Sequence, residues 1–405
     1  MAKNVFLPAN ILIPDGISNE KWAVVACDQF TSEPEYWKSV EKFVGEAPST
    51  LKMIVPEAYL GDFDEEKGIK EIRKVMDEYL AKGIFKELKD SFVYVERKQN
   101  DGNIRYGLVG VVNLDEYDFS EKSNAAIIAS EGTVLDRLPP RIRVRRQASL
   151  ELPHIMALIN DAGKTVIEPL AKKVSNLTKV YDFELMEEGG HLRGYHVSGS
   201  DAQEVITALD ELHKKSSALL VMGDGNHSLA AAKAYWDEIK QGLSDEEKKS
   251  HIAKYALVEI NNVYDPAIGF EAIHRVLFEC NADDFVKAFE SAMPKGTDYE
   301  ISWHAGGKSG KVGIAAKTIG DMLSVMQDFL DEYAEKNDLE QDYIHGDDVL
   351  LKLVETKNTV GLMLPSMGKS DFFDTVLNSG VFPRKSFSIG HARDKRYYME
   401  CRKII

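Results

Sequence analysis

The chain has 405 residues, of which 44% are hydrophobic and 29% are charged, and its formal net charge at pH 7 is −16. This length is enough for two or three domains with an ample core, and the composition is typical of globular proteins in water. The acidic balance argues against nucleic-acid binding, which needs a basic face, and no apolar run approaches the roughly 20 residues of a membrane span.

The first residues carry no recognisable targeting signal. Residues 1–14 lack the basic start and long apolar centre of a signal peptide, so the cytoplasm is the expected location. Residues 5–15 predict a short strand with a turn, and residues 22–27 predict a second strand. Three cysteines lie far apart and outside any CxxC motif, namely Cys27, Cys280 and Cys401. They are typical of reduced thiols rather than of a disulfide framework or a zinc site.

The first region, residues 1–124, is predicted to combine helices with paired strands. In residues 64–82 apolar side chains recur on one face of a helix, and Gly83 ends that helix. Residues 92–98 and 104–114 predict two strands around an Asn-Asp-Gly-Asn turn, which is typical of a hairpin.

The central region, residues 125–265, contains an arginine-rich stretch that allows two interpretations. Arg141, Arg143 and Arg145 alternate with apolar residues, which predicts a strand with three guanidinium groups on one face. Such a face favours a bound phosphate or carboxylate, because guanidinium groups bind these anions through paired hydrogen bonds. The alternative is that the arginines protect an exposed edge strand or pair with acidic groups elsewhere in the chain.

Further elements of this region lead to its centre. Residues 154–160 are predicted to be helical, and residues 181–185 and 191–197 to form a hairpin. Ser200 to Gln203 has the pattern of a capping box that opens a helix reaching Lys215.

An apolar strand, residues 218–222, then runs into the sequence Gly-Asp-Gly-Asn-His-Ser at residues 223–228, called here the 223–228 loop. A strong helix-forming segment follows. A buried strand, a glycine turn and a helix N-terminus together favour a bound anion, because backbone N–H groups and the helix dipole point at one spot. The loop predicts phosphate contacts from Gly223, Gly225, Asn226 and Ser228.

Two side chains of the loop suggest chemistry. Asp224 is a candidate ligand for Mg²⁺, which binds one or two carboxylates together with phosphate oxygens. His227 is a candidate for transferring a proton. The spacing matches neither a Walker loop nor a dinucleotide fingerprint, and an Asp-Gly turn before a helix also occurs as a purely structural feature.

The last region, residues 266–405, continues the alternation of helices and strands. A helix is predicted from Asn281, two strands at 299–304 and 311–316, and a long amphipathic helix at 319–334. Residues 381–405 contain seven Lys or Arg against two acidic residues, which makes a second basic segment. The whole pattern predicts an α/β or α+β fold with mixed sheets in two to three closely packed domains.

Several segments resemble one family in the same order along the chain: residues 130–133, 141–146, 153–161, 223–228, 274–276, 343–346 and 382–387. The chain resembles a bacterial and archaeal family of uncharacterised proteins, the domain-of-unknown-function family numbered ten-fifteen. The loop of that family usually reads Ala-Asp-Gly-His-His-Arg, so this chain keeps Asp224, Gly225 and His227 but has Ser228 in place of the arginine. The loop is also distantly similar to that of ParB, sulfiredoxin and free-serine kinases, which implies a turn that cradles nucleotide phosphates.

These segments contain further site candidates, which are Glu131, Thr133, His274, Arg275, His345, Lys385 and Ser386. Glu131 is a second candidate for moving a proton. Lys385 and Ser386 are candidates for binding phosphate, because a cation is needed where this chain lacks the arginine of the loop.

Together the candidates favour a small-molecule enzyme, a phosphate- or nucleotide-dependent transferase of the kinase-like class. Its expected cofactors are Mg²⁺ and a nucleotide, and its expected partner is a small anionic ligand. A non-catalytic ligand-binding or regulatory protein that uses the same pocket is the alternative, and a structural turn with arginines in internal ion pairs is a third. No GxSxG or HExxH motif supports a hydrolase, no helix-turn-helix signal supports DNA binding, and nothing indicates an oligomeric state.

Overall fold

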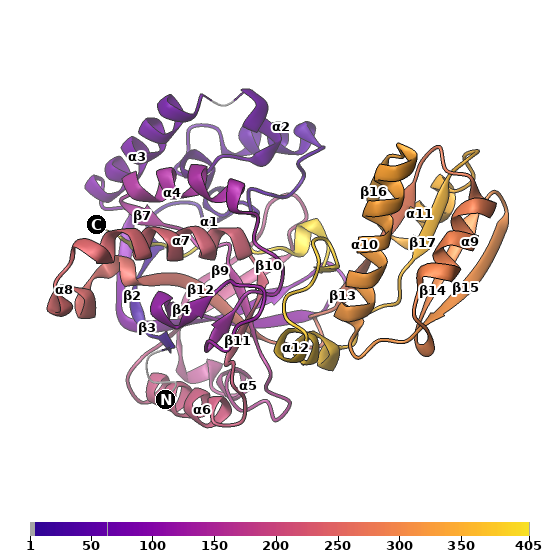
Figure 1. The fold of residues 1–405 in the computed structure, drawn as a ribbon. Helices are drawn as coiled ribbons and strands as arrows, with labels where there is room; N and C mark the ends of the chain where they lie inside the picture. The colour runs from indigo at the N-terminus through magenta and orange to yellow at the C-terminus, as the bar shows by residue number, and fades with distance from the viewer. Residues whose placement is uncertain (1–4, 63, 405) are drawn as a thin grey trace. The chain divides into compact units, whose positions relative to one another are not determined.

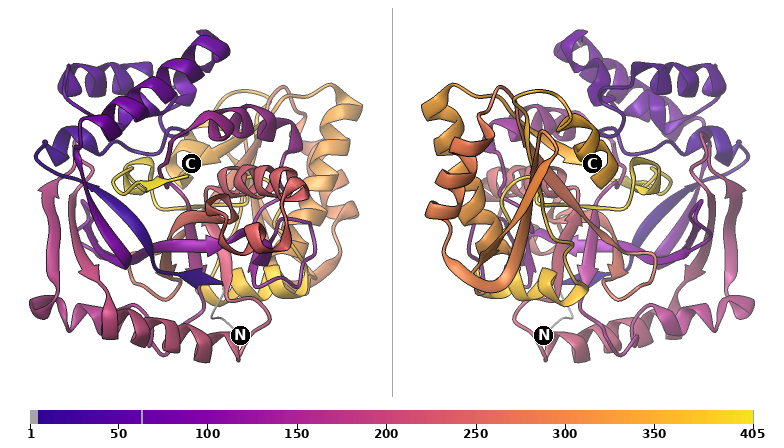
Figure 2. Two further views of the ribbon diagram at one scale, coloured as in Figure 1. Left: turned by 90° about the vertical axis from the view of Figure 1, so that its left-hand side faces the viewer. Right: turned by 90° about the vertical axis from the view of Figure 1, so that its right-hand side faces the viewer.

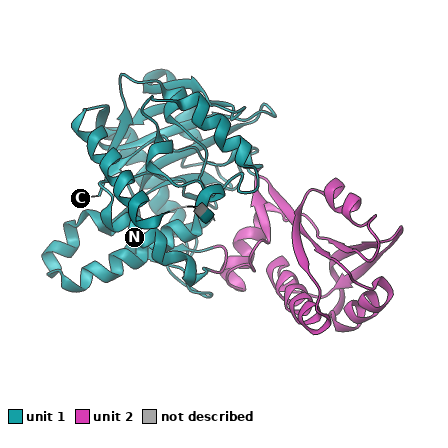
Figure 3. Ribbon diagram, turned by 90° about the horizontal axis from the view of Figure 1, so that it is seen from above, with its two compact units in different colours: residues 1–129, 133–268, 391–405 teal, residues 130–132, 269–390 magenta. Residues whose placement is uncertain are grey.

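A computed structural model describes residues 5–62 and 64–404, which fall into two compact units. Unit 1 consists of residues 1–129, 133–268 and 391–405, and unit 2 of residues 130–132 and 269–390 (Figure 3). The expected boundary after residue 124 falls inside unit 1, whereas the one after residue 265 lies close to Gly269, where the long segment of unit 2 begins. The fold is mixed α/β, as the sequence predicts.

The strands of unit 1 build a large mixed sheet. Their bounds are β1 Phe6–Leu7, β2 Ala9–Pro14, β3 Phe85–Lys98, β4 Ile104–Asn113, β5 Tyr117–Asp118, β6 Ile127–Ile128, β7 Leu150–Glu151, β8 Met156–Ile159, β9 Thr178–Glu184, β10 His191–Val197, β11 Leu220–Asp224, β12 Tyr255–Asn262 and β19 Arg402–Lys403. The sheet runs β5-β6-β11-β8-β12-β4-β3-β10-β9, with β1 added to β4 and β2 to β3, while β7 and β19 form a separate pair. Strand β11 lies parallel to β6 and antiparallel to β8.

The helices of unit 1 are α1 Asn19–Trp22, α2 Pro34–Val44, α3 Glu65–Ala81, α4 Leu138–Gln147, α5 Glu168–Ala171, α6 Gly199–His213, α7 Asn226–Ile239 and α8 Asp245–Ser250. Unit 1 also contains short 3-10 helices, which are η2 Thr50–Met53, η3 Glu57–Asp62, η4 Leu114–Glu116, η5 Leu135–Arg137, η6 Val174–Asn176, η7 Lys240–Gly242, η8 Ile252–Lys254 and η9 Ala392–Asp394.

The sheet is buried on both faces because helices cover each of them. Alternate residues of a strand point to opposite faces, so Val93 and Val95 join one apolar cluster and Phe92 and Tyr94 another. Helices α2 and α3 contribute to the first cluster, and α5, α6 and α7 to the second. Figures 1 and 2 show α2 and α3 on one side of the strands and α6 on the other.

Several predicted elements of unit 1 are confirmed. The helix expected at 64–82 is α3, whose N-cap residue Asp64 accepts a hydrogen bond from the Lys67 amide. The hairpin of β3 and β4 and the hairpin of β9 and β10 are both present.

Other predictions are wrong. The arginine stretch forms helix α4 rather than a strand, and residues 156–159, expected to be helical, form strand β8. Residues 22–27 do not form a strand, because Trp22 ends helix α1 and Val25 makes only an isolated bridge with Tyr397. Helix α6 begins at Gly199 with Ser198 as N-cap residue, so the capping box expected at Ser200 does not form.

Unit 2 has its own sheet and helices. Its strands are β13 Phe270–Leu277, β14 Lys295–Ala305, β15 Lys308–Ile314, β16 Gln341–His345, β17 Val360–Met363 and β18 Phe387–Ile389, and its helices are α9 Ala282–Ala292, α10 Ile319–Asn337, α11 Asp347–Leu353 and α12 Lys369–Asn378. The sheet runs β15-β14-β17-β13-β16, and β18 pairs with β13. The predicted helices at 281 and 319 and the strands around 300 and 312 are confirmed. No helix in the described ranges has both the length and the apolar character needed to cross a membrane.

Candidate functional site

The 223–228 loop joins β11 to α7 within unit 1. Residues 220–222 of β11 are buried, whereas residues 223–228 are partly exposed. Gly225 is the N-cap residue of α7 and has a left-handed backbone with φ 75°, which a glycine adopts without strain. The N-terminus of a fourteen-residue helix therefore faces a partly open loop, an arrangement that favours an anion.

Asp224 and Lys395 form an ion pair beside this helix end. Asp224 Oδ1 accepts the Gly225 amide at 2.8 Å, and Oδ2 lies 3.6 Å from Lys395 Nζ. Lys395 comes from the C-terminal segment that returns to unit 1. The loop thus acquires a cation from a residue 171 positions away in the chain.

His154 contacts both the loop and the C-terminal segment. Met156 of β8 pairs with Asp224 of β11, which brings His154, two residues earlier, next to the start of α7. Its Nε2 lies 3.0 Å from Ser228 Oγ, and its Nδ1 lies 3.2 Å from the hydroxyl of Tyr398. Both ring nitrogens therefore have hydroxyl partners.

Cys27 and Asp28 interact with these residues, Cys27 through its amide to the Tyr398 hydroxyl and Asp28 electrostatically with His154. Burial alone would raise the pKa of Asp28, but the electrostatic interaction with His154, a hydrogen bond from Gln29 and the charge on Lys395 outweigh it, so the pKa lies below its usual value. Burial and the neighbouring Asp28 carboxylate raise the pKa of the Cys27 thiol to about 12. At neutral pH the site therefore holds a carboxylate and a neutral thiol side by side.

His227 is held by the backbone. Its Nε2 accepts the amide of Val134 at 3.2 Å, so this nitrogen carries no proton while the bond persists. The neighbouring residue Thr133 has a buried hydroxyl that finds no hydrogen-bond partner in the described part of the chain. Buried polar groups are rarely left without a partner, so this hydroxyl is a candidate ligand contact.

The arginines of α4 each contact a carboxylate of unit 1. Arg141 Nη2 lies 2.6 Å from Glu57, Arg143 binds Glu65 through two nitrogens at 2.6 and 2.8 Å, and Arg145 lies 2.7 Å from Glu151. These ion pairs correspond to the alternative in which the arginines find partners within the chain. Helix α4 packs against α7 through Leu138, Ile142 and two alanines of α7.

The remaining candidates belong to unit 2. Glu131 forms a bridge with Phe382, and the Ser386 hydroxyl donates to the Pro383 carbonyl at 2.6 Å. His274 is buried in β13, where its Nε2 lies 2.7 Å from Asp347 and its Nδ1 accepts the Leu364 amide.

Two cations of unit 2 lie over one aromatic ring. The guanidinium of Arg275 is 4.4 Å from the ring centre of Tyr343, and Lys385 Nζ is 5.6 Å from it. Arg275 is fully buried, and burial lowers its pKa to about 10, so it stays charged at neutral pH. His345 is an exposed residue of β16, opposite Ile273 of β13. The structure therefore groups Glu131, His274, Arg275, His345, Lys385 and Ser386 in unit 2, and their joint action with the 223–228 loop stays a prediction.

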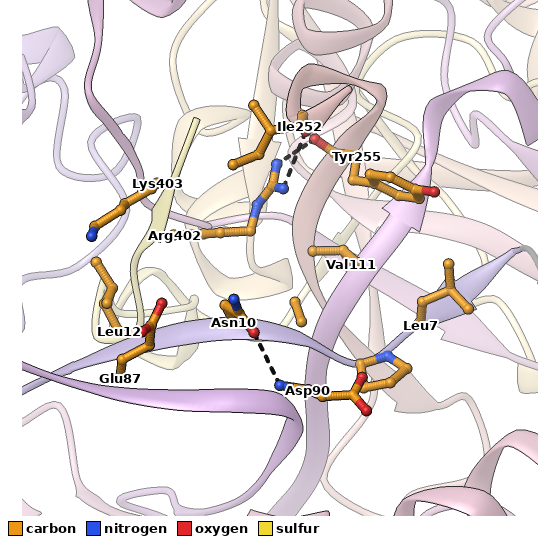
Figure 4. A pocket seen from close by; sticks show the side chains of 12 residues that line it. Leu7, Asn10, Leu12, Glu87, Asp90, Val111, Ile252, Tyr255, Arg402 and Lys403 are labelled. Atoms are coloured by element: carbon orange, nitrogen blue, oxygen red, sulfur yellow. Dashed lines mark hydrogen bonds between the residues drawn. The ribbon is translucent and has the colours of Figure 1, made fainter. Parts of the chain in front are cut away.

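A pocket of about 470 Å³ lies elsewhere in unit 1 (Figure 4). Its polar groups serve internal contacts, because Arg402 binds the Tyr255 carbonyl at 2.6 Å and Asn10 accepts the Asp90 amide at 3.1 Å. Its lining includes Glu87 and Lys403 but no residue of the 223–228 loop. This pocket is therefore separate from the candidate site.

Sequence reasoning missed His154, Tyr398 and Asp28 as site residues. His154 lies inside the segment 153–161 that carries the family resemblance, and Lys395 lies inside the basic C-terminal segment, so both had a weak signal. Tyr398 and Asp28 had none, because only the fold brings them to the loop.

The residues around Asp224 could bind a metal ion only if a phosphate-containing ligand supplied further coordinating oxygens. In the described ranges no group of three or more His, Cys, Asp and Glu side chains is placed to hold a metal ion. One Asp224 oxygen accepts an amide and the other faces Lys395. A Mg²⁺ ion at this carboxylate would need phosphate oxygens for most of its coordination.

Comparisons with known proteins identify a matching family model and solved structures with distant similarity. The model of the family described as protein of unknown function (DUF1015) matches residues 14–367. No curated protein sequence matches the chain.

Solved structures with similar architecture include a conserved hypothetical protein from Pyrococcus furiosus, with 12% identity over 71% of this chain and 90% of that chain and a TM-score of 0.32. A free serine kinase in complex with AMP has 11% identity, coverage of 73% and 91%, and a TM-score of 0.37. SbnI with a C-terminal truncation, from Staphylococcus aureus, has 10% identity, coverage of 70% and 82%, and a TM-score of 0.38. Similarity at this level carries no assignment of function.

Proposed function

The chain belongs to the DUF1015 family of proteins of unknown function, and from the geometry of its loop we propose that it is a small-molecule enzyme that binds a phosphate or nucleotide at residues 223–228. The proposed reaction is phosphoryl transfer of the kinase-like class, with a small anionic ligand as the bound partner.

One observation carries the proposal: the N-terminus of α7, Lys395 and the Ser228–His154 pair converge on one partly exposed loop within unit 1. A helix N-terminus alone binds anions weakly, but a cation from a distant segment adds a charge-assisted partner for phosphate. The unsatisfied Thr133 hydroxyl, next to the Val134 amide that binds His227, adds a polar group that a ligand would satisfy.

Each residue has a role in this proposal. Gly223, Gly225 and Asn226 let the backbone approach the phosphate closely, and Lys395 neutralises its charge. Asp224 would hold Mg²⁺ together with phosphate oxygens, and this ion supplies further neutralisation of the charge that develops during transfer. His227 positions the segment at Val134, because its Nε2 is occupied by the backbone amide.

The test is a calorimetric titration of the full chain with ATP, ADP, CTP and inorganic phosphate, each with and without Mg²⁺. We expect at least one nucleotide to bind. Lys395→Ala should weaken its binding by about 10- to 100-fold, which corresponds to a lost charged hydrogen bond of about 1.5–3 kcal/mol. Lys249→Ala, at an exposed lysine of α8, is the matched control and should leave binding unchanged.

Two other outcomes have a defined meaning. If none of the four ligands binds to protein that circular dichroism shows to be folded, the proposal fails. Tight nucleotide binding without transfer to any small acceptor would support the non-catalytic ligand-binding or regulatory alternative instead.

A further inference from the structure

The hydroxyl of Ser228 is aimed at an imidazole rather than at its own helix. Ser228 is the third residue of α7, whose N-cap residue is Gly225, and the helix has no side-chain cap. The Ser228 amide is already bonded to the Gly225 carbonyl at 3.0 Å. Its Oγ instead lies 3.0 Å from His154 Nε2, the distance expected between a hydroxyl nucleophile and its base.

Tyr398 orients the His154 imidazole through the ring nitrogen that does not face Ser228. His154 Nδ1 lies 3.2 Å from the Tyr398 hydroxyl, and the two rings meet edge to face with centroids 5.6 Å apart. The Tyr398 oxygen also accepts the Cys27 amide at 3.2 Å. In the tautomer whose Nδ1–H donates to the Tyr398 oxygen, the Nε2 lone pair faces Ser228.

A carboxylate interacts electrostatically with the imidazole. The Asp28 carboxylate interacts electrostatically with His154 and with Lys395. When His154 accepts a proton, this carboxylate stabilises the imidazolium, as the third member of a nucleophile–base–acid arrangement does. Ser228, His154 and Asp28 come from three separate segments of unit 1, and the pairing of β8 with β11 places the first two together.

We propose that Ser228 is a catalytic nucleophile that receives the phosphoryl group as a phosphoserine, with His154 as its general base and Tyr398 as a positioning residue. This inference rests on the proposed function, because the phosphoryl donor is the nucleotide bound at the 223–228 loop.

The reaction has two balanced steps. In the first, Ser228 Oγ forms a bond to the terminal phosphorus of the nucleotide, the bridging P–O bond breaks, and the Oγ proton moves to His154 Nε2. The leaving group is the nucleotide shortened by one phosphate. In the second, the hydroxyl of the small acceptor attacks the phosphoserine and releases its proton to water, while Ser228 Oγ leaves and recovers its proton from His154.

The environment of Ser228 is compatible with the first step, the transfer of a phosphoryl group to its hydroxyl. A phosphoryl group on residue 228 lies within the first turn of α7, where the helix dipole favours negative charge. Ser228 and His154 are both partly exposed, so a nucleotide reaches them without opening the core.

The experiment is a rapid-quench reaction of the full chain with γ-³²P-ATP, β-³²P-ADP and, as a donor that needs no nucleotide site, ³²P-acetyl phosphate. The quench is acid, because phosphoserine survives acid whereas phosphohistidine and acyl phosphates do not. Peptide mapping then locates the label. We expect acid-stable label on Ser228 and none in Ser228→Ala.

His154→Gln, assayed at nucleotide concentrations that the calorimeter shows to saturate this variant, should slow labelling by about 10²-fold or more, the usual contribution of a general base. Ser250→Ala, at an exposed serine of α8, is the matched control and should label normally. Circular dichroism melts of each variant identify any that fails to fold, and Ser228→Thr, which keeps a hydroxyl, replaces Ser228→Ala if needed and should retain slow labelling.

The outcomes separate this inference from the proposed function. If nucleotides bind but no donor labels Ser228, the nucleophile is overturned and the binding function stands. If no nucleotide binds, the proposed function fails, and the reaction with acetyl phosphate alone tests whether Ser228 is a nucleophile. Label on Ser228 that depends on His154 would then support this role, and the absence of such label would overturn it.

Discussion

One imidazole belongs to the 223–228 loop and a second contacts it, and the hydrogen bonds of the two rings differ. His227 Nε2 accepts a backbone amide, so this ring holds Val134 against the start of α7. His154 contacts the hydroxyls of Ser228 and Tyr398 through its two nitrogens. Hydroxyl partners can exchange a proton with the ring, whereas an amide donor cannot. Under the proposed mechanism, His154 transfers the proton and His227 Nε2 supports the backbone at Val134.

Two arginines of the same helix make ion pairs in different surroundings. Arg145 and Glu151 are both largely buried, with side-chain exposures of 13% and 7%, whereas Arg143 and Glu65 are exposed by 46% and 40%. Breaking a buried pair leaves a buried charge without its partner, while an exposed pair contributes little.

We therefore predict that Arg145→Met lowers the free energy of unfolding by about 3 kcal/mol, the lower end of the range for a broken buried pair, because Arg402 still binds Glu151 at 2.5 Å. Arg143→Met is the matched control and should lower it by less than about 1 kcal/mol. Urea titrations measure both, and calorimetry with the best nucleotide should show unchanged affinity. Weaker ligand binding by the Arg143 variant would support the phosphate-binding role that the sequence suggests for this stretch.

The spacing of the site residues along the chain determines which of them can be predicted from the sequence. Asp224, His227 and Ser228 were recognised because they are neighbours in one loop between a strand and a helix. His154 and Tyr398 were not, since they are 244 positions apart and meet only through the sheet and the returning C-terminus. Local patterns carry no information about such contacts.

At the scale of elements, the geometry of the loop depends on the junction of β11 and α7. Gly225 has φ 75°, and a Cβ atom built there would lie 3.0 Å from the Ile155 Cα, a backbone atom of the segment that carries His154. A side chain at residue 225 would therefore strain its own backbone and push on the neighbouring segment.

Gly225→Ala should accordingly lower the free energy of unfolding by about 1–2 kcal/mol, the usual penalty for an L-residue in the left-handed region. It should also weaken nucleotide binding, because α7 and His154 move apart. Gly242→Ala is the control, since residue 242 has open space around it and no left-handed backbone. Urea titration and calorimetry on both variants measure the effects, and equal stability of the two would contradict the argument.

Elements with strong periodicity or turn signals were predictable, and short ambiguous ones were not. Helix α3 has its cap, its apolar stripe and its terminal glycine in sequence, and β3 and β4 have their turn. The sequence of α4 alternates as that of a strand would. In the structure, however, its arginines pair with carboxylates on four different elements, α3, η3, β7 and α7, and a helix can reach these partners because its side chains point in several directions. Strand β8 is a four-residue apolar run, which periodicity cannot distinguish from a helix.

At the scale of the molecule, the C-terminal segment 391–405 ties unit 1 together through buried charges. Arg396 pairs with Glu259 and Glu400, and Arg402 pairs with Glu151, all of them buried. Burial would raise the pKa of Glu151 and Glu259, but the arginine charges outweigh it and hold both below their usual value of 4.5. Ion pairs of unit 2 such as His274–Asp347 and Lys308–Asp283 have carboxylates that are more than two-thirds exposed.

This difference predicts that unit 1 loses stability first in acid. A carboxyl group whose pKa is lower in the folded than in the unfolded state stabilises the fold above its unfolded value, and this contribution disappears as the pH falls through the folded value. The stability of unit 1 should therefore drop steeply below about pH 4.5, while that of unit 2 changes less.

Tryptophan fluorescence can isolate unit 1, because Trp22, Trp37 and Trp236 belong to it and Trp303 is the fourth tryptophan of the chain. In a Trp303→Phe variant, thermal melts between pH 7 and pH 3 by fluorescence should show a larger fall of the midpoint than melts by far-UV circular dichroism, which reports both units. Glu151→Gln in this background should unfold more easily at pH 7 but show a flatter pH dependence, because one of the titrating groups is gone. Parallel midpoints by the two methods at every pH would show that the buried carboxylates of unit 1 do not set its acid stability.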